Sequence, residues 1–294
     1  MTCPSHDRNG VYRRSTAKAP LLPLCLAALM LAMPAAHAAD WPSEAPLRGS
    51  FQPPAPAGSS GVRWDGIVFG AHFGVSNMNT DYSHATQPLI GSLITNSTVG
   101  AEVRPQDWIL MPNATSSGRQ YGGFVGYNMQ WDDVVVGFDV AYNRGVNLGT
   151  SSNGSIRRVV ATSDGVVHDI GALSTGSITL LDYAALRFRA GYTFGQFMPF
   201  AVLGAAVGRF DQSTSVEFRD VQSSGGNTST FAPPVATSSK QNSYVGGFVG
   251  GLGVDVALLP NVFLRAEWEY AGFAKVNGIS TSMNTGRVGV GVRF

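Results

Sequence analysis

From Trp64 to the end of the chain, apolar side chains recur at every second position in eight segments. In the clearest segment, Val262–Tyr270, the apolar face alternates with a face that carries Arg265, Glu267 and Glu269. A period of two is that of a β-strand with two unlike faces, so the pattern predicts an all-β chain. The eight segments are Trp64–Ser76, Tyr121–Gln130, Asp133–Asn143, Ile178–Thr193, Pro199–Phe210, Tyr244–Leu258, Val262–Tyr270 and Arg287–Phe294.

The connections between these segments alternate in length. Those at 131–133, 194–198 and 258–261 are short, whereas 77–120, 144–177, 211–243 and 271–286 are long and polar. Short turns at one end and long loops at the other are typical of a transmembrane β-barrel, whose single-chain bacterial forms have an even number of strands. Closure is required because an open sheet edge in lipid leaves backbone groups unpaired. We therefore predict an eight-stranded antiparallel transmembrane β-barrel over residues 64–294, with short periplasmic turns and long outer loops.

The composition supports this class and argues against others. Only 13% of residues are charged, about half of the ~25% that is usual in soluble domains. No stretch reaches the ~18 consecutive apolar residues of a membrane helix. The formal net charge is +1 with scattered arginines, which argues against a nucleic-acid partner, because such proteins concentrate basic residues on one face.

The N-terminal region predicts export. A basic segment precedes the apolar run Ala19–Met33, and Ala36-His37-Ala38 has the form of a cleavage site, so residues 1–38 are expected to be a signal peptide. Residues 39–63 are rich in proline and are expected to form a periplasmic linker. Both cysteines, Cys3 and Cys25, lie in the signal. The expected mature chain therefore has no disulfide and no cysteine metal site. The export signal and the predicted transmembrane barrel together predict that the protein is located in the outer membrane.

The two faces of the strands differ in a way that suits a barrel in lipid. The face with aromatic residues near the strand ends is expected to face lipid, since membrane barrels carry aromatic girdles. The other face carries glycine and charges, which fill the narrow interior of an eight-stranded barrel. Antiparallel pairing about the turn at 258–261 predicts that Asp255 lies opposite Arg265. The predicted lumen charge network is Asp139, Arg187, Arg189, Asp255, Arg265, Glu267, Glu269, Arg287 and Arg293.

Several short motifs, in this order and spacing, resemble a known family. They are Gly126-Tyr127-Asn128 with Gln130, Arg187–Tyr192, Pro199-Phe200, Arg265–Tyr270 and Val288–Phe294. The chain resembles the small alphaproteobacterial porin-like outer-membrane proteins of the outer-membrane immunogenic protein type. The resemblance implies an eight-stranded barrel whose terminal Phe294 is read by the barrel-assembly machinery. Members of this family include surface antigens, proteins called porins and haemin binders.

The expected function is a structural, surface or porin-like role without a large open pore, with outer-membrane lipid as a partner. Haemin binding through the outer loops is an alternative, with His84, His168 and Tyr82 as possible ligands. The other interpretation of these three residues is that they are solvated loop residues. A soluble ligand-binding barrel and a lipid-modifying barrel enzyme are further alternatives. No strand supplies a serine, histidine and acid together on its apolar face, so we expect no catalytic residues, no resident cofactor and no metal.

Overall fold

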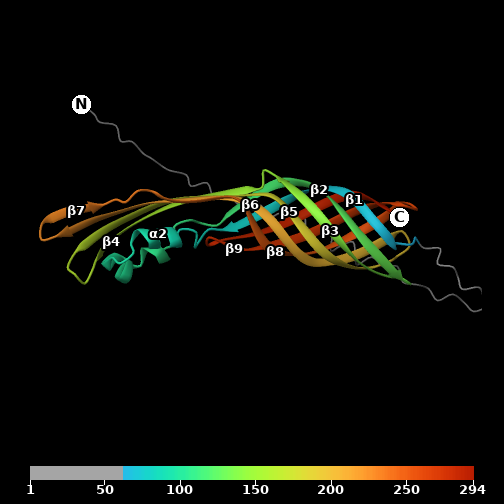
Figure 1. Cartoon of the computed structure of the whole chain (residues 1–294), viewed down its shortest axis with the longest axis horizontal. Helices are drawn as coiled ribbons and strands as arrows, with labels where there is room; N and C mark the ends of the chain where they lie inside the picture. The colour runs from blue at the N-terminus through green and yellow to red at the C-terminus, as the bar shows by residue number, and fades with distance from the viewer. Residues whose placement is uncertain (1–61) are drawn as a thin grey trace, which may run out of the picture. The chain divides into compact units, whose positions relative to one another are not determined.

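The computed structural model describes residues 62–294, so the predicted signal peptide and nearly all of the predicted linker lie outside the described residues. Within residues 62–294 the chain forms ten antiparallel strands (Figure 1). They are β1 Gly66–Asp81, β2 Ala114–Trp131, β3 Val134–Val146, β4 Gly149–Ala161, β5 Val167–Tyr192, β6 Phe197–Ser224, β7 Asn227–Phe231, β8 Ala236–Leu259, β9 Val262–Val276 and β10 Ile279–Arg293. No helix in this part of the chain is long and apolar enough to cross a bilayer.

Eight of the strands close into a ring. The order around it is β1, β2, β3, β5, β6, β8, β9 and β10, and β10 pairs with β1. Each of the eight predicted segments coincides with one of these strands, so the predicted barrel is confirmed. The last residue takes part in closure, because Phe294 N donates to Ile67 O and Ile67 N donates to Phe294 O, both at 2.9 Å.

The strands present their apolar face outward. Phe73, Phe138 and Leu186 are all more than half exposed, whereas Asp139, Arg187 and Arg189 are at most 2% exposed. An apolar exterior around a buried charged interior is the reverse of a soluble barrel and is what a lipid-facing barrel requires. The exterior band ends in tyrosines on several strands, including Tyr121 on β2 and Tyr142 on β3.

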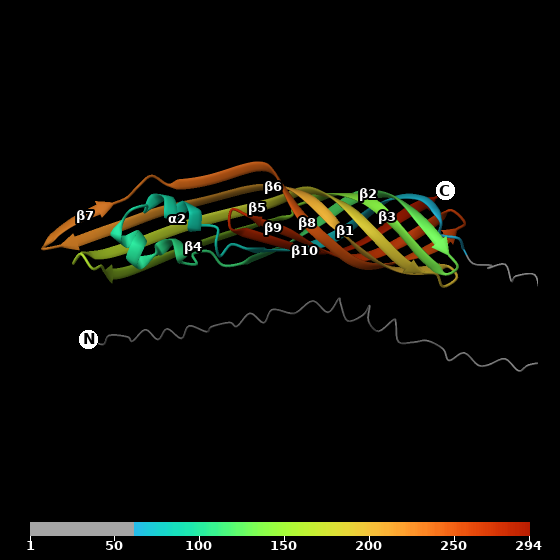
Figure 2. The ribbon, with the colours of Figure 1, turned by 60° about the horizontal axis from the view of Figure 1, so that its bottom comes forward.

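The strands continue well beyond the barrel, which the sequence did not predict. β5 and β6 have 26 and 28 residues, far more than the ~9–11 of a spanning strand. Beyond the ring they carry β4 and β7 on their outer edges and form a flat sheet (Figures 1 and 2). We call this part the sheet extension, which comprises β4, β7, residues 167–180 of β5, 211–224 of β6 and 236–240 of β8.

The prediction that 144–177, 211–243 and 271–286 are loops was therefore wrong, because most of these residues are strand. Their Ser, Thr, Asn and Gly content favours turns, but one face of the sheet extension is buried. On β5 that face carries Ile170, Ala172 and Ile178 at even positions, and on β6 it carries Val216 and Phe218. A covered face needs only alternate apolar residues, so a polar average composition is compatible with a long strand.

The predicted loop 77–120 also contains structure, and much of it covers this buried face. It includes the short helix α2 (Gln87–Leu93), a π-helical turn at Val99–Val103 and a 3₁₀ turn at Pro105–Asp107. Ile90, Trp108 and Met111 from this segment are buried in one cluster with residues of β5 and β6. Figure 2 shows α2 lying over the sheet extension. We call residues 82–113 the helical cover.

Register shifts mark the junction between the barrel and the sheet extension. The β5–β6 pairing shifts between Leu180 and Asp182, and the β6–β8 pairing shifts between Phe210 and Gln212. An extra residue at such a bulge bends a strand and increases its twist. The two bulges therefore allow β5 and β6 to leave the curved barrel wall and continue as a flatter sheet.

Candidate functional site: the filled lumen

Three layers of side chains fill the barrel interior. The lower apolar layer, next to the short turns, is centred on Trp64, Phe124, Phe200 and Phe263. The charged layer lies above it and consists of Asp139, Arg187, Arg189, Asp255, Arg265, Glu267, Glu269 and Arg287, all at most 5% exposed. The upper apolar layer includes Met78, Tyr183, Phe210, Phe273 and Met283 and continues into the core under the helical cover.

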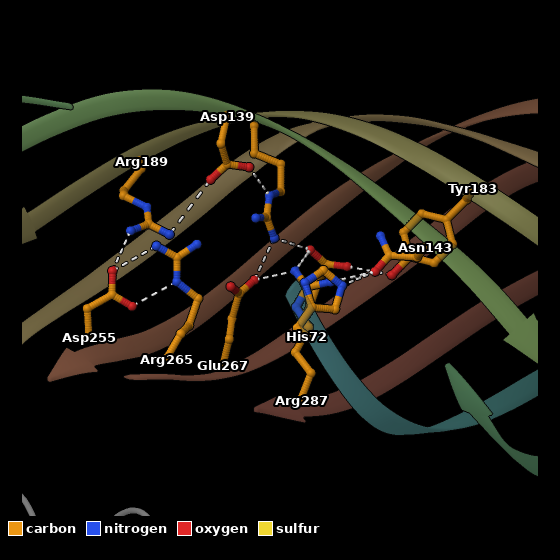
Figure 3. A network of polar contacts seen from close by, with 11 residues as sticks. His72, Asp139, Asn143, Tyr183, Arg189, Asp255, Arg265, Glu267 and Arg287 are labelled. Carbon is orange, nitrogen blue, oxygen red and sulfur yellow. Dashed lines mark hydrogen bonds and ion pairs between the residues drawn. The ribbon is translucent and has the colours of Figure 1, made fainter. Parts of the chain in front are cut away.

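Strand pairing positions the lower half of the charged layer. The register places Asp255 of β8 opposite Arg265 of β9, as the turn between these strands predicts. Arg265 Nε and Nη2 donate to the two oxygens of Asp255 at 2.7 and 2.8 Å, which is a bidentate arrangement. Arg189 of β5 donates to Asp255 at 2.8 Å from across the lumen (Figure 3). Asp255 is thus held by two arginines from different strands.

The upper half of the charged layer is built around Arg187. Its Nε donates to Asp139 on the adjacent strand at 2.7 Å. Its Nη1 donates to Glu267 at 2.6 Å and to Glu269 at 2.8 Å, both on β9. Arg287 of β10 donates to the same two glutamates, to Glu267 at 2.5 Å and to Glu269 at 2.7 Å. Two arginines and three carboxylates therefore form one connected unit.

Uncharged polar groups border this unit. Tyr183 donates its hydroxyl to Glu269 at 2.8 Å, and Arg287 donates to the Asn143 side-chain oxygen at 3.2 Å. The ring of His72 lies 2.6 Å from the same Asn143 oxygen (Figure 3). His72 is therefore a hydrogen-bonded residue of the lumen.

Aromatic rings of the lower layer pack against the arginines above them. The guanidinium of Arg189 lies 3.9 Å from the ring centre of Phe200, and that of Arg265 lies 4.0 Å from the ring centre of Phe124. Such stacking stabilises a desolvated cation. Glycine makes room for these rings: a Cβ on Gly253 would lie 2.4 Å from an edge carbon of Phe200. The interface between the two layers is therefore closely packed.

The charged layer is electrically balanced, because it contains four arginines and four carboxylates. Balance matters because a buried charge without a partner is strongly destabilising. Arg293, which the sequence analysis placed in this network, is not part of it. It stacks on Trp64 with 4.9 Å to the ring centre and donates to the carbonyl of Pro260. Arg293 is the last residue of β10, at the short-turn end of the strand, and it therefore lies beside Trp64 of the lower apolar layer and not in the charged layer.

The structure does not bring together an exposed set of the three possible haem ligands. Tyr82 is fully buried and donates to Thr150 O at 2.8 Å. His168 is 4% exposed, and its Nδ1 lies 2.8 Å from Asp220. His84 is exposed and contacts Ser83. Two of the three are thus enclosed in the core under the helical cover. Among residues 62–294, no three His, Cys, Asp or Glu side chains are grouped as a metal site.

The links across the lumen, and the sheet extension with its cover, were not predicted from the sequence. Alternation identifies which face a residue occupies, but it does not show which residues meet across a closed ring. The signal for the extension was present in the alternate apolar residues Ile170, Ala172 and Ile178 of a segment otherwise rich in Ser and Gly. The signal for the cover was the run of apolar residues around Ile90 and Trp108 within a predicted loop.

Comparison with known families agrees with the ring of strands. The family described as outer membrane protein beta-barrel domain matches residues 24–294, nearly the whole chain. The chain belongs to this family. Membership implies an outer-membrane location. No curated protein matches the chain.

Solved barrels of this kind are similar to the chain at low identity. Ail, the attachment invasion locus protein of Yersinia pestis, is 14% identical with a TM-score of 0.28, over 78% of this chain and 99% of Ail. Neisserial surface protein A is 15% identical with a TM-score of 0.31, over 77% and 97%. OprG from Pseudomonas aeruginosa is 13% identical with a TM-score of 0.35, over 80% and 98%. The fold assignment rests on the family match and on the ring itself.

Proposed function

We propose that the protein is an outer-membrane surface protein whose barrel is an anchor without a large open pore and whose sheet extension is displayed outside the cell. Within the family, the motifs around Arg187 and Arg265 favour the small porin-like, outer-membrane immunogenic type. The proposal includes export by the signal in residues 1–38 and insertion by the barrel-assembly machinery through the C-terminal strand that ends at Phe294. It includes no catalytic role.

The filling of the lumen carries this proposal. An eight-stranded barrel is only wide enough for its own side chains, and here three stacked layers occupy that space. The charged layer blocks the passage of solutes, because every arginine in it donates to at least one carboxylate within 2.8 Å. Opening a path would separate buried ion pairs, which is strongly unfavourable.

The location of the sheet extension supports the surface role. It rises from the end of the barrel opposite the short turns (Figure 1). In membrane barrels the short turns face the periplasm and the long connections face outward. The extension and its helical cover also enclose a buried core that is continuous with the upper apolar layer of the barrel, so the extension is packed onto the barrel as a folded structure.

Single-channel recording tests the proposal. We expect the refolded protein in planar bilayers to give no large, stable conductance steps. The variant D255A/R265A is a matched comparison, because it removes one arginine and one carboxylate and keeps the layer neutral. It is expected to give small, brief steps where the wild type gives none. Large steps from the wild-type protein would contradict the anchor role.

A further inference from the structure

A cluster of arginines lies on the outside of the barrel, where the exterior apolar band ends. On β2 the last residue of the band is Tyr121, and Arg119 is the next residue outward on the same face of the strand. On β3 the last residue of the band is Tyr142, and Arg144 is the next residue outward. On β6 the band ends at Val207, followed by Arg209. From Trp131 to Tyr121 a strand tilted as in membrane barrels rises roughly 25 Å, which is the height of the lipid-facing band. These arginines are therefore at the level of the lipid headgroups.

Strand register brings the cluster together. Arg144 of β3 is directly opposite Asp182 of β5, and Asp182 is directly opposite Arg209 of β6. Tyr121 is opposite Arg144, which makes Arg119 the diagonal neighbour of Arg144 on the same face, within reach of a long side chain. We call Arg119, Arg144, Asp182 and Arg209 the rim cluster.

The rim cluster has more positive charge than its own acid neutralises. Asp182 accepts two hydrogen bonds from Arg209 and one from the Tyr142 hydroxyl at 3.1 Å. Arg144 approaches the same carboxylate only to 3.8 Å and stays half exposed. Arg119 is exposed and forms no ion pair with any other residue in the described part of the chain. Three arginines therefore share one carboxylate, and two guanidinium groups have donors free for another anion.

A hollow lies next to Arg119. Its volume is about 410 Å³, and its lining includes Asn77 of β1, Ser117 and Arg119 of β2, and Asn147 after β3. Ser117 donates its hydroxyl to the Asn77 side-chain oxygen at 2.6 Å, so the side-chain amide groups of Asn77 and Asn147 line the hollow as donors together with Arg119. Val75 borders the hollow where the apolar band ends. This combination of polar donors, excess positive charge and an adjacent apolar surface matches an amphiphile with an anionic head.

We propose that the rim cluster binds the phosphate of a phosphorylated lipid headgroup in the outer leaflet, with Arg119 and Arg144 as the donors. A guanidinium forms paired hydrogen bonds with phosphate oxygens, which makes arginine well suited to this ligand. Arg209 is held by Asp182 and serves to position the cluster. The proposal rests on the barrel's place in the outer membrane and names a partner for it.

The test measures lipid binding by the mature protein in detergent micelles, with native mass spectrometry as the readout. The probes are bisphosphorylated lipid A, phosphatidylethanolamine, and inorganic phosphate without any acyl chain. The test variant is R119Q/R144Q, which leaves the Arg209–Asp182 pair intact. The control is R157Q/R219Q, which removes the same charge from two exposed arginines beside Asp169 on the sheet extension, away from the apolar band.

We expect lipid A to bind the wild-type protein more tightly than phosphatidylethanolamine does. R119Q/R144Q should weaken lipid A binding about tenfold or more, as expected for loss of at least one hydrogen bond to a charged group. R157Q/R219Q should stay within about twofold of wild type, because a surface charge away from the ligand acts only through a screened field.

Three outcomes would overturn the proposal. Equal weakening by both variants would indicate general electrostatic attraction, and unchanged binding by R119Q/R144Q would exclude the rim cluster. Inorganic phosphate binding as tightly as lipid A would assign the cluster to a free anion instead of a lipid. Failure of the anchor role is measured separately, because it would appear as large conductance steps of the wild-type protein in planar bilayers. The lipid-binding measurement does not depend on conductance. Heat-modifiable migration on gels checks that each variant is a closed barrel.

Discussion

Replacing Arg187 by methionine should destabilise the barrel more than any other single change in the charged layer. Arg187 is 1% exposed and, among residues 62–294, it alone forms hydrogen bonds to all three of Asp139, Glu267 and Glu269. Methionine keeps much of the side-chain volume but removes the charge and all three donors. The layer is then left with three arginines and four carboxylates, so one buried negative charge has no counterpart.

The size of the effect depends on which carboxylate loses most. Glu267 and Glu269 keep Arg287 as a donor at 2.5 and 2.7 Å. Asp139 keeps only Arg189 at 3.7 Å, and its second oxygen accepts no hydrogen bond in the described structure. Removing one partner of a buried pair destabilises by about 3–5 kcal/mol, and we expect R187M to fall in that range. Adding D139N should recover at least about 1.4 kcal/mol, because every remaining charge then has a close partner.

The assay is urea unfolding of the refolded protein in phospholipid vesicles, followed by tryptophan fluorescence, with coincident unfolding and refolding curves as the test of reversibility. The wild type, R187M, D139N and the double variant complete a double-mutant cycle. R157M is the control, since Arg157 is exposed on the sheet extension and bonds only Asp169 there; it should leave barrel unfolding unchanged. Strictly additive losses in the cycle would refute the reasoning that charge balance holds the layer together.

Two further predictions concern the sheet extension and its cover. A Cβ on Gly154 would lie 1.8 Å from the carbonyl oxygen of Leu110, whereas one on Gly171 would meet no atom within 4 Å. G154A should therefore increase cleavage by a glutamate-specific protease after the exposed Glu102 in the helical cover, while G171A should not. Equal cleavage of the two variants would show that this contact does not hold the cover in place. Asp81, beyond the apolar band, accepts hydrogen bonds from the side chain and backbone N–H of Ser83, which lower its pKa below the ordinary 3.8. A lowered pKa gives stability that is present above 3.8 and is lost as pH falls through the folded-state value. D81N should thus reduce hydrogen-exchange protection of the Ser83 amide at neutral pH, and the difference from wild type should vanish in strong acid; a difference that persists there would exclude the ionised carboxylate as its cause.

The period-two pattern of the chain determined the barrel and which residues face its interior. This pattern is local, because successive side chains of a strand point to opposite faces whatever the strand pairs with. The pairing of Asp255 with Arg265 was also accessible, since a short turn sets the register of the two strands that it joins. The inward positions of Arg187, Glu267 and Glu269 followed from the same alternation.

Only the closed ring decided that Arg187 meets two glutamates 80 and 82 residues away in sequence. The stagger of strands around a barrel sets which residues lie at one height across the lumen, and no local pattern encodes it. The same holds for Arg293, whose inward position was visible but whose height below the charged layer was not. The sheet extension was hidden because its strands are half covered by residues 82–113, and that cover depends on contacts such as Ile90 with the sheet. A segment acquires a buried face only when its distant partner folds over it, so this part of the structure is a property of the whole chain.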